Sequence, residues 1–207
     1  MTTPQTSSPD RSQISPAARF ARAAHRGSLL LITAVAASAA AFSPASANLA
    51  VGATAPDFTI PSAVAGKTAQ FSLREALSKG PVVVYFYPKS FTSVCTIEAN
   101  LFAEAMPQFE ALGASVIGIS TDDIETQRAF STKECRDKFP VGADADGKVA
   151  TAYDAVWGFG KMVVASRTSY VVTPDGRIGS AHSASDAESH IETALSFVKS
   201  WRSTQAK

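Results

Sequence analysis

Apolar runs separated by short polar segments give this chain an alternating pattern of strands and helices. The run PVVVYFY, residues 81–87, is β-branched and aromatic and too short for a helix, so it predicts a buried strand. GASVIGIS, residues 113–120, predicts a second buried strand, and APDFTI, residues 55–60, predicts a short one. TSYVVTPDGRIGSAH, residues 168–182, predicts two strands joined by a turn at 174–176.

Helical patterns follow these strands. Apolar residues recur in steps of four, three, four and three, as one face of a helix requires, at Cys95, Ala99, Phe102, Met106 and Phe109. Pro107 falls inside this pattern and is expected to kink or split the helix. Residues 121–139 predict a second helix, with acids in its first turn, Lys and Arg in its last turn, and Cys135 near its end. Residues 186–202 predict an amphipathic closing helix.

This order of elements predicts an α/β fold with a central mixed β-sheet flanked by helices. In such sheets the functional site lies at the carboxyl ends of the strands. Cys95 follows the strand 81–87 after a short turn and opens its helix, so it is placed at that edge. Phe102, Met106 and Phe109 are predicted core residues. Trp157 is predicted to pack a loop, and a position flanking the site is the alternative.

The first 47 residues are predicted to be a cleaved signal peptide. A segment with four arginines and one acid precedes an apolar run of about 16 residues, 27–42, and the small residues Ala45-Ser46-Ala47 follow it. The run is shorter than the ~20 residues that span a bilayer, which disfavours a permanent anchor. Organelle targeting is a minor alternative. Cleavage after Ala47 leaves one mature domain, residues 48–207, exported to the bacterial periplasm and without stable membrane insertion.

The mature segment has no sequence feature of a nucleic-acid-binding or metal-binding protein. Of the 19 Lys and Arg residues 15 lie after residue 47, as do 17 of the 18 Asp and Glu residues, so its formal charge is about −2. No basic run is present to neutralise phosphates. His182 and His190 are too few for a metal cluster, and Asp144 and Asp146 lack the later glutamate of a calcium loop. No cofactor or metal is therefore expected.

The surroundings of Cys95 favour a reactive thiol. A helix N-terminus favours the thiolate through its partial positive charge and free backbone N–H groups. Thr92 lies in the preceding turn, where its hydroxyl can point at the sulfur, and Pro88 can end the strand and shield the thiolate. Arg167, directly before the strand at 168, reaches the same sheet edge if that strand pairs with 81–87. Glu98, one helical turn after Cys95, is positioned to hold this arginine.

Pro88, Thr92 and Cys95 form the spacing P-x-x-x-T-x-x-C, which resembles the signature of the peroxiredoxins. The stretch YFYPKSFTSVCTIEA is similar to their Q, or bacterioferritin-comigratory, branch. VGATAPDFTI, GASVIGISTDD, DKFPVGADADGKVATAYDAVWG and the Arg167 before TSYVVTPDGRI extend the resemblance along almost all of residues 48–207. The resemblance implies a thioredoxin-like fold and a thiol-dependent peroxidase that reduces hydrogen peroxide and small organic hydroperoxides. It implies that Cys95 is the peroxidatic nucleophile, that Thr92 and Arg167 bind and polarise the peroxide, and that Pro88 shields the thiolate.

The resolving thiol departs from the commonest pattern of that branch. Many members carry a second cysteine five residues after the first, where this chain has Asn100, and Ser93-Val94 replaces the common Pro-Gly. Cys135, which we place in the next helix, is the candidate resolving cysteine of an intramolecular disulfide, and forming that disulfide requires local unwinding. If Cys135 is instead a bystander, an external thiol completes the cycle.

Two other functional classes are compatible with the same cysteines. Cys95 and Cys135 could form a permanent disulfide in an exported thioredoxin-fold binding or scaffold protein without catalysis. A disulfide reductase is disfavoured because no C-x-x-C pair is present. For the peroxidase, the expected partners are a peroxide and a thioredoxin- or glutaredoxin-like thiol reductant, and the expected state is a monomer or weak homodimer.

Overall fold

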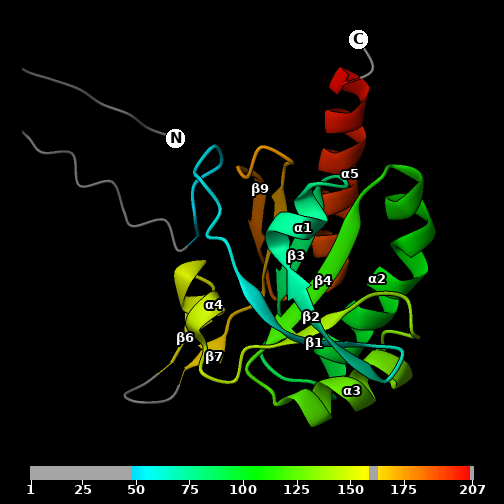
Figure 1. Cartoon of the computed structure of the whole chain (residues 1–207), viewed down its shortest axis with the longest axis vertical. Coiled ribbons are helices and arrows are strands. Elements are labelled where there is room, and N and C mark those ends of the chain that lie inside the picture. The colour runs from blue at the N-terminus through cyan, green and yellow to red at the C-terminus, as the bar shows by residue number, and fades with distance from the viewer. Residues whose placement is uncertain (1–47, 159–162, 206–207) are drawn as a thin grey trace, which may run out of the picture. The chain divides into compact units, whose positions relative to one another are not determined.

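The buried strand β3, Val82–Phe86, lies inside a seven-stranded mixed sheet (Figure 1). A computed structural model of the chain describes residues 48–158 and 163–205. The strand order is β2-β1-β5-β4-β3-β8-β9. β3 runs parallel to β4, Ser115–Ser120, and β4 runs parallel to β5, Val141–Ala143. The antiparallel strands of the sheet are β1 (Thr59–Val64), β2 (Lys67–Ser72), β8 (Thr168–Val172) and β9 (Ile178–Ser183).

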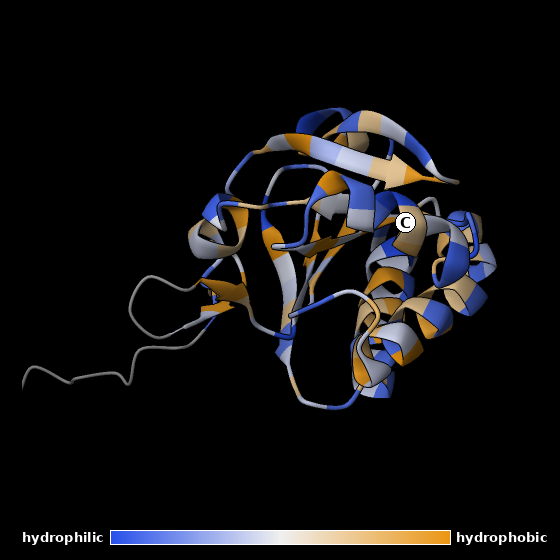
Figure 2. Cartoon of the chain, turned by 90° about the horizontal axis from the view of Figure 1, so that it is seen from below, coloured by the Kyte–Doolittle hydropathy of each residue, from blue (hydrophilic) through white to orange (hydrophobic). Residues whose placement is uncertain are grey.

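Helices cover both faces of the sheet because the side chains of β3 alternate between two apolar cores. Val83 and Tyr85 belong to one core, and Val82, Val84 and Phe86 belong to the other. The first core is completed by α2 (Ser93–Ala111), α3 (Ile124–Lys133) and α5 (Glu188–Gln205). The second is completed by α1 (Leu73–Leu77) and α4 (Lys148–Ala152). Figure 2 shows apolar residues on these strands and on the helix faces that cover them.

The α/β architecture and the main strands agree with the sequence-based predictions. The strands predicted in 81–87 and 113–120 are β3 and β4, and the hairpin predicted in 168–182 is β8 and β9. The predicted core residues Phe102, Met106 and Phe109 are buried. The short elements β2, α1, β5 and α4 were not predicted, because elements of three to six residues carry little periodic signal.

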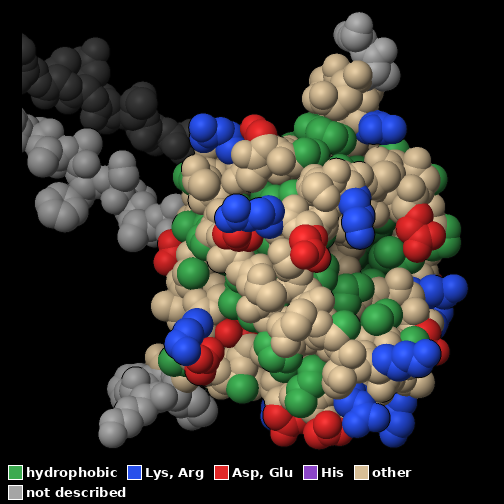
Figure 3. All heavy atoms as spheres, in the orientation of Figure 1, with side chains coloured by type: hydrophobic (Ala, Val, Ile, Leu, Met, Phe, Trp, Pro, Cys, Tyr) green, Lys and Arg blue, Asp and Glu red, His purple; other side chains and the backbone are tan. Residues whose placement is uncertain are grey.

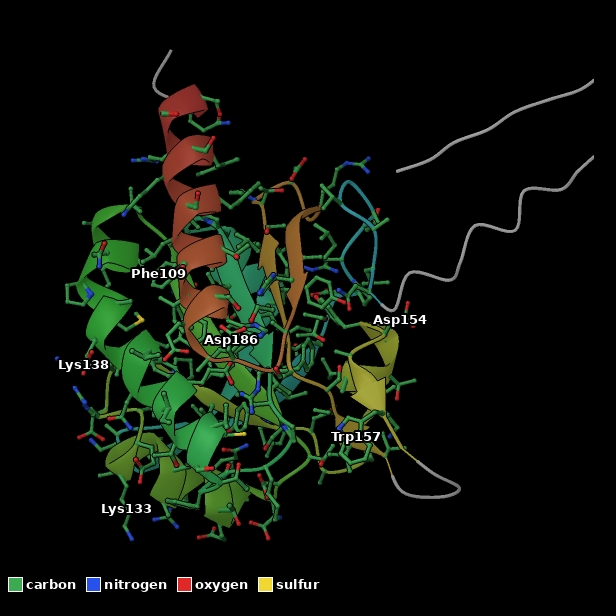
Figure 4. The ribbon with its side chains drawn as sticks, turned by 180° about the vertical axis from the view of Figure 1, so that it is seen from behind. Phe109, Lys133, Lys138, Asp154, Trp157 and Asp186 are labelled. Atoms are coloured by element: carbon green, nitrogen blue, oxygen red, sulfur yellow. The ribbon has the colours of Figure 1, made fainter. Side chains whose placement is uncertain are left out.

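Two predictions about local structure were wrong, as was one of the two outcomes expected for Pro107. α2 is not split at Pro107, because Pro107 lies on the exposed face of the helix, where water can satisfy the unpaired carbonyl. Cys135 lies beyond α3 rather than in it, since the helix ends at Lys133. Trp157 does not pack a loop: it lies in the small hairpin of β6 (Val156–Trp157) and β7 (Val164–Ala165) and is 61% exposed (Figure 4). The signal peptide predicted for residues 1–47 lies outside the described residues.

The described surface carries charges of both signs. On the face shown in Figure 3, lysine and arginine side chains are interspersed with aspartate and glutamate and form no continuous basic area. No helix among the described residues is long and apolar enough to cross a membrane. No group of three potential metal-ligating side chains occurs in the part of the chain that the structure describes.

Candidate active site

Cys95 lies in the first turn of α2, which follows the carboxyl end of β3 after the loop of residues 87–92. Thr92 is the N-cap residue, and the first hydrogen bond within the helix joins the amide of Thr96 to the carbonyl oxygen of Thr92 at 2.9 Å. The backbone N–H groups of the first turn, which ends at Cys95, therefore have no acceptor within the helix. Cys95 is only 2% exposed. Its sulfur thus lies in a shielded position at the end of the helix that favours an anion.

The loop between β3 and α2 is held in place by Asp122, which follows β4. The Asp122 carboxylate accepts hydrogen bonds from the Ser90 amide at 2.7 Å, the Ser120 hydroxyl at 2.9 Å and the Lys89 ammonium at 3.0 Å. Burial raises the pKa of Asp122, but these donors outweigh it and leave the pKa below its usual value. Asp122 therefore remains a carboxylate and fixes the turn that carries Thr92 and Cys95.

A strained residue lies inside this loop. Phe91 has a left-handed backbone with φ of 63°, which is uncommon for a bulky side chain. Its ring packs edge-on against Phe130 of α3, with ring centroids 5.2 Å apart, and remains 45% exposed. The loop conformation therefore depends on α3 as well as on Asp122.

Arg167 joins Cys95 to Glu98. The antiparallel register that pairs Phe86 with Thr168 places Arg167 at the carboxyl end of β3. Its Nη2 donates to Cys95 Sγ at 3.2 Å, and its Nη1 donates to Glu98 Oε2. The Arg167 side chain is 11% exposed and that of Glu98 is fully buried. The structure thus brings together the three charged or ionisable groups that the sequence pattern predicts at this edge.

Burial and Arg167 act on the Glu98 carboxyl in opposite directions. Burial raises the pKa of Glu98 to about 8, against the opposing effect of the Arg167 guanidinium. Burial prevails because only Oε2 receives a hydrogen bond; no donor among the described residues reaches Oε1. The pKa of Arg167 is raised: burial acts to lower it, but its contacts with Glu98 and Cys95 outweigh that effect.

The other two predicted site residues flank this centre. Thr92 is exposed, and its hydroxyl donates to the carbonyl oxygen of Lys89 at 2.9 Å. It makes no hydrogen bond that caps the helix, so the lone pairs of its oxygen remain available to an incoming donor. Pro88 is half-buried and lies two residues beyond the end of β3, which agrees with its predicted role in ending the strand.

Chemically, the arrangement combines a sulfur at a helix N-terminus, a guanidinium on that sulfur and a hydroxyl in the adjoining turn. A family model described as the AhpC/TSA family matches residues 51–181. The chain belongs to the AhpC/TSA family. It is therefore a peroxiredoxin, an enzyme with thiol-dependent peroxidase activity that acts on a peroxide and takes its electrons from a thiol reductant.

Similar proteins support the assignment to the Q branch of the peroxiredoxins. A putative peroxiredoxin of Mycobacterium tuberculosis is 34% identical over 154 residues, which cover 73% of this chain and 97% of that protein. Peroxiredoxin Bcp of Xanthomonas campestris is 30% identical over 149 residues, which cover 70% of this chain and 91% of that protein. The crystal structure of peroxidoxin BcpB of M. tuberculosis superposes with a TM-score of 0.67 at 31% identity, covering 72% of this chain and 96% of that one. The shared fold is the thioredoxin-like fold of peroxiredoxins.

The second cysteine of this peroxiredoxin is buried and reduced. Both cysteines are free, so the structure contains no Cys95–Cys135 disulfide. Burial raises the pKa of the Cys135 thiol, and the neighbouring carboxylates Glu134 and Asp137 raise it further. While it is buried in this way, Cys135 therefore remains a protonated thiol and is a weak nucleophile.

Polar contacts tie the segment around Cys135 to α2. The Arg136 guanidinium donates to Asn100 Oδ1 at 2.9 Å and to Glu104 Oε1 at 3.1 Å. Asn100 Nδ2 in turn donates to Glu134 Oε2 at 3.2 Å. Arg136 and Asp137 have left-handed backbones, with φ of 53° and 59°. We call these contacts among Asn100, Glu104, Glu134 and Arg136 the α2 latch.

Two residues that matter for the site were not predicted from the sequence. Asp122 was interpreted as one of the acids in a helical first turn, yet it anchors the loop before α2. His190 was dismissed as a metal ligand, yet it lies buried with its Nδ1 3.9 Å from Glu98 Oε1. The position of Asp122 directly after a strand was an available signal for its role, whereas no local signal pointed to His190.

A surface hollow lined by Thr54, Leu73 and Pro174 lies near the opposite end of β3 and takes no part in the site.

Proposed function

We propose that Cys95 is the peroxidatic nucleophile of this enzyme and that Arg167 and Thr92 bind the peroxide. The observation that carries the proposal is the 3.2 Å contact from Arg167 Nη2 to Cys95 Sγ at the N-terminus of α2. A guanidinium and free amide groups around one sulfur stabilise a thiolate, which is the reactive form of cysteine. They are also suited to stabilising the oxygen anion that leaves when a peroxide bond breaks.

The reaction step moves one oxygen atom to the sulfur. The Cys95 thiolate attacks the terminal oxygen of ROOH, an S–O bond forms and the O–O bond breaks. The sulfur is oxidised to a sulfenic acid that keeps the hydroperoxide proton, and RO⁻ leaves and takes a proton from solvent to become ROH. Arg167 stabilises the negative charge as it passes from sulfur to the leaving oxygen. The Thr92 oxygen accepts a hydrogen bond from the peroxide O–H, since its own hydrogen is donated to Lys89.

Cys135 is proposed as the resolving thiol. Its thiol attacks the sulfenic sulfur, an S–S bond forms, and the S–O bond breaks with release of water. Because Cys135 is fully buried and protonated, the segment that follows α3 must open before this step. The left-handed backbones of Arg136 and Asp137 lower the cost of opening, while the α2 latch opposes it.

Substrate, reductant and location are further parts of the proposal. Hydrogen peroxide and small organic hydroperoxides are the proposed substrates. A similar structure, the bacterioferritin comigratory protein of X. campestris, is described by its alkyl peroxide reduction activity and is 26% identical to this chain. A thioredoxin- or glutaredoxin-like protein is the proposed reductant. The enzyme itself is proposed to be a monomer or weak homodimer. Cleavage after Ala47 and export to the periplasm rest on the sequence pattern of residues 1–47.

The test is peroxide turnover by three forms of the full protein with a dithiol reductant. Cys95→Ser is expected to abolish turnover. Cys135→Ser is expected to retain the first oxidation of Cys95 and to lose the intramolecular disulfide. Full turnover by Cys95→Ser would overturn the assignment of the nucleophile, and turnover by Cys135→Ser equal to that of the unsubstituted protein would remove Cys135 from the cycle.

A further inference from the structure

The carboxylate oxygen of Glu98 that Arg167 does not bind faces a buried histidine. His190 of α5 is fully buried, and its Nδ1 lies 3.9 Å from Glu98 Oε1. The same Nδ1 lies 2.7 Å from Ser169 Oγ, and Nε2 lies 3.3 Å from the carbonyl oxygen of Ala184. A continuous chain of polar groups thus leads from the sulfur through Arg167 and Glu98 to His190.

These contacts determine where the hydrogen on the His190 ring lies. A carbonyl oxygen only accepts, so the Nε2 beside Ala184 must carry a hydrogen. In the neutral ring Nδ1 then carries a lone pair, which accepts a hydrogen bond from the Ser169 hydroxyl. Glu98 Oε1 therefore faces another acceptor, and no described residue donates to it. The 3.9 Å between Oε1 and Nδ1 exceeds hydrogen-bond range, and a proton on Oε1 removes the repulsion between the two acceptors.

We infer that Glu98 carries a proton on the oxygen that faces the His190 lone pair, and that His190 is a positioning residue that acts through this proton on Arg167. While the proton is held, Glu98 is not a full counter-charge, and the Arg167 guanidinium acts undivided on the Cys95 sulfur. When the proton is lost, the Glu98 carboxylate neutralises Arg167. The inference rests on the proposed roles of Cys95 and Arg167.

The surroundings of the pair support a proton on Glu98 at neutral pH. Burial raises the pKa of Glu98 to about 8, and burial lowers that of His190 to about 4. His182 of β9 packs edge-on against the His190 ring at 4.8 Å, and its positive form would repel a second cation there. The Asp186 carboxylate accepts from the Ser189 amide at 2.9 Å at the start of α5 (Figure 4). The titratable or charged groups that face the pair are Tyr85 of β3, Cys95 of α2, Arg167, His182 of β9 and Asp186.

The predicted consequence is a rate of Cys95 oxidation that falls with pH as Glu98 titrates. It falls by roughly ten-fold when Glu98 loses its proton near pH 8, because the guanidinium is then compensated. The falling limb of the pH profile therefore reports the proton on Glu98.

The experiment measures the pH profile of single-turnover oxidation by hydrogen peroxide in full-length protein carrying Cys135→Ser. His190→Gln supplies an amide N–H that can donate to Oε1, so it should move the falling limb to lower pH by about one unit. Ser169→Ala removes the competitor for the Nδ1 lone pair and should move the limb to higher pH. Val198→Ala, equally buried about two turns along α5, controls for lost packing and should leave the limb in place.

Opposite shifts in the two variants would support the proton on Glu98, since a merely structural role of His190 would not produce them. A falling limb that stays in place in both variants, or that shifts equally with Val198→Ala, would overturn it. If Cys95 does not react at any pH, the proposed function has failed and the proton is tested separately. Infrared spectra at neutral pH should then show a protonated buried carboxyl that is absent in Glu98→Gln, and its absence from the unsubstituted protein would overturn the inference.

Discussion

Arg167 is the residue on which the chemistry of this site depends, because one guanidinium serves two acceptors. Its Nη2 donates to the Cys95 sulfur at 3.2 Å while its Nη1 is held by Glu98. Two donors in a fixed plane can meet both acceptors at once, which a single ammonium group cannot do with the same geometry. The orientation of the guanidinium is therefore as important as its charge.

Replacement of Arg167 separates these two contributions. Arg167→Ala is expected to lower the second-order rate constant for Cys95 oxidation by roughly 10²–10³-fold, as loss of one preorganised donor to a developing anion does. Arg167→Lys keeps the charge and is expected to recover only part of this loss. Stopped-flow measurement of a single turnover would test both variants, and a lysine variant as fast as the unsubstituted enzyme would show that charge alone suffices.

The turn from β3 to α2 and the segment after α3 form two separately anchored parts of the active site. Asp122 holds the first through Ser90 and Lys89, and the α2 latch holds the second. Cycling between sulfenic acid and disulfide requires that the second part open while the first keeps the peroxide site intact. The left-handed Arg136 stores strain of roughly 1–2 kcal/mol in the segment that must open.

Loss of the α2 latch should accelerate disulfide formation. Arg136→Ala removes the bonds to Asn100 and Glu104 but keeps a residue that is strained in the left-handed region. The disulfide is therefore expected to form several-fold faster after one equivalent of peroxide, with less over-oxidation of Cys95 to sulfinic acid. Arg74→Ala is the matched control, since Arg74 lies in α1 and forms an exposed ion pair with Asp57, which precedes β1. A slower disulfide in Arg136→Ala would contradict a restraining role of the latch.

The fold could be predicted from the sequence where a local signal fixes each part. The apolar run 81–87 predicted β3, the helical pattern after Cys95 predicted α2, and Arg167 directly precedes a strand that pairs with β3. Local patterns could not predict contacts between distant segments. The approach of His190 to Glu98 depends on how α5 packs beside α2, and the end of α3 before Cys135 is marked by no glycine or proline.

The stability of the whole molecule should depend on pH through His190. Burial lowers its pKa to about 4 from an ordinary 6.5, so between these values His190 binds a proton in the unfolded chain and not in the folded one, whereas Glu98, with its pKa raised to about 8, does the reverse. The contribution of the neutral His190 ring is complete above pH 6.5 and is lost as pH falls towards 4, by on the order of 3 kcal/mol. Denaturant unfolding should therefore show that His190→Gln gains stability relative to the unsubstituted protein as the pH is lowered from 7 to 4. Parallel curves for the two proteins would contradict the prediction.

The measurement that tests the central claim most directly is reaction of the fully reduced protein with one equivalent of hydrogen peroxide, followed by mass spectrometry under non-reducing conditions. We predict that about one equivalent is consumed and that a Cys95–Cys135 disulfide forms through a sulfenic acid on Cys95. Cys95 left as a sulfenic or sulfinic acid would keep the peroxidase step and exclude Cys135 from it. A reduced Cys95 that ignores the peroxide would contradict its role as the nucleophile.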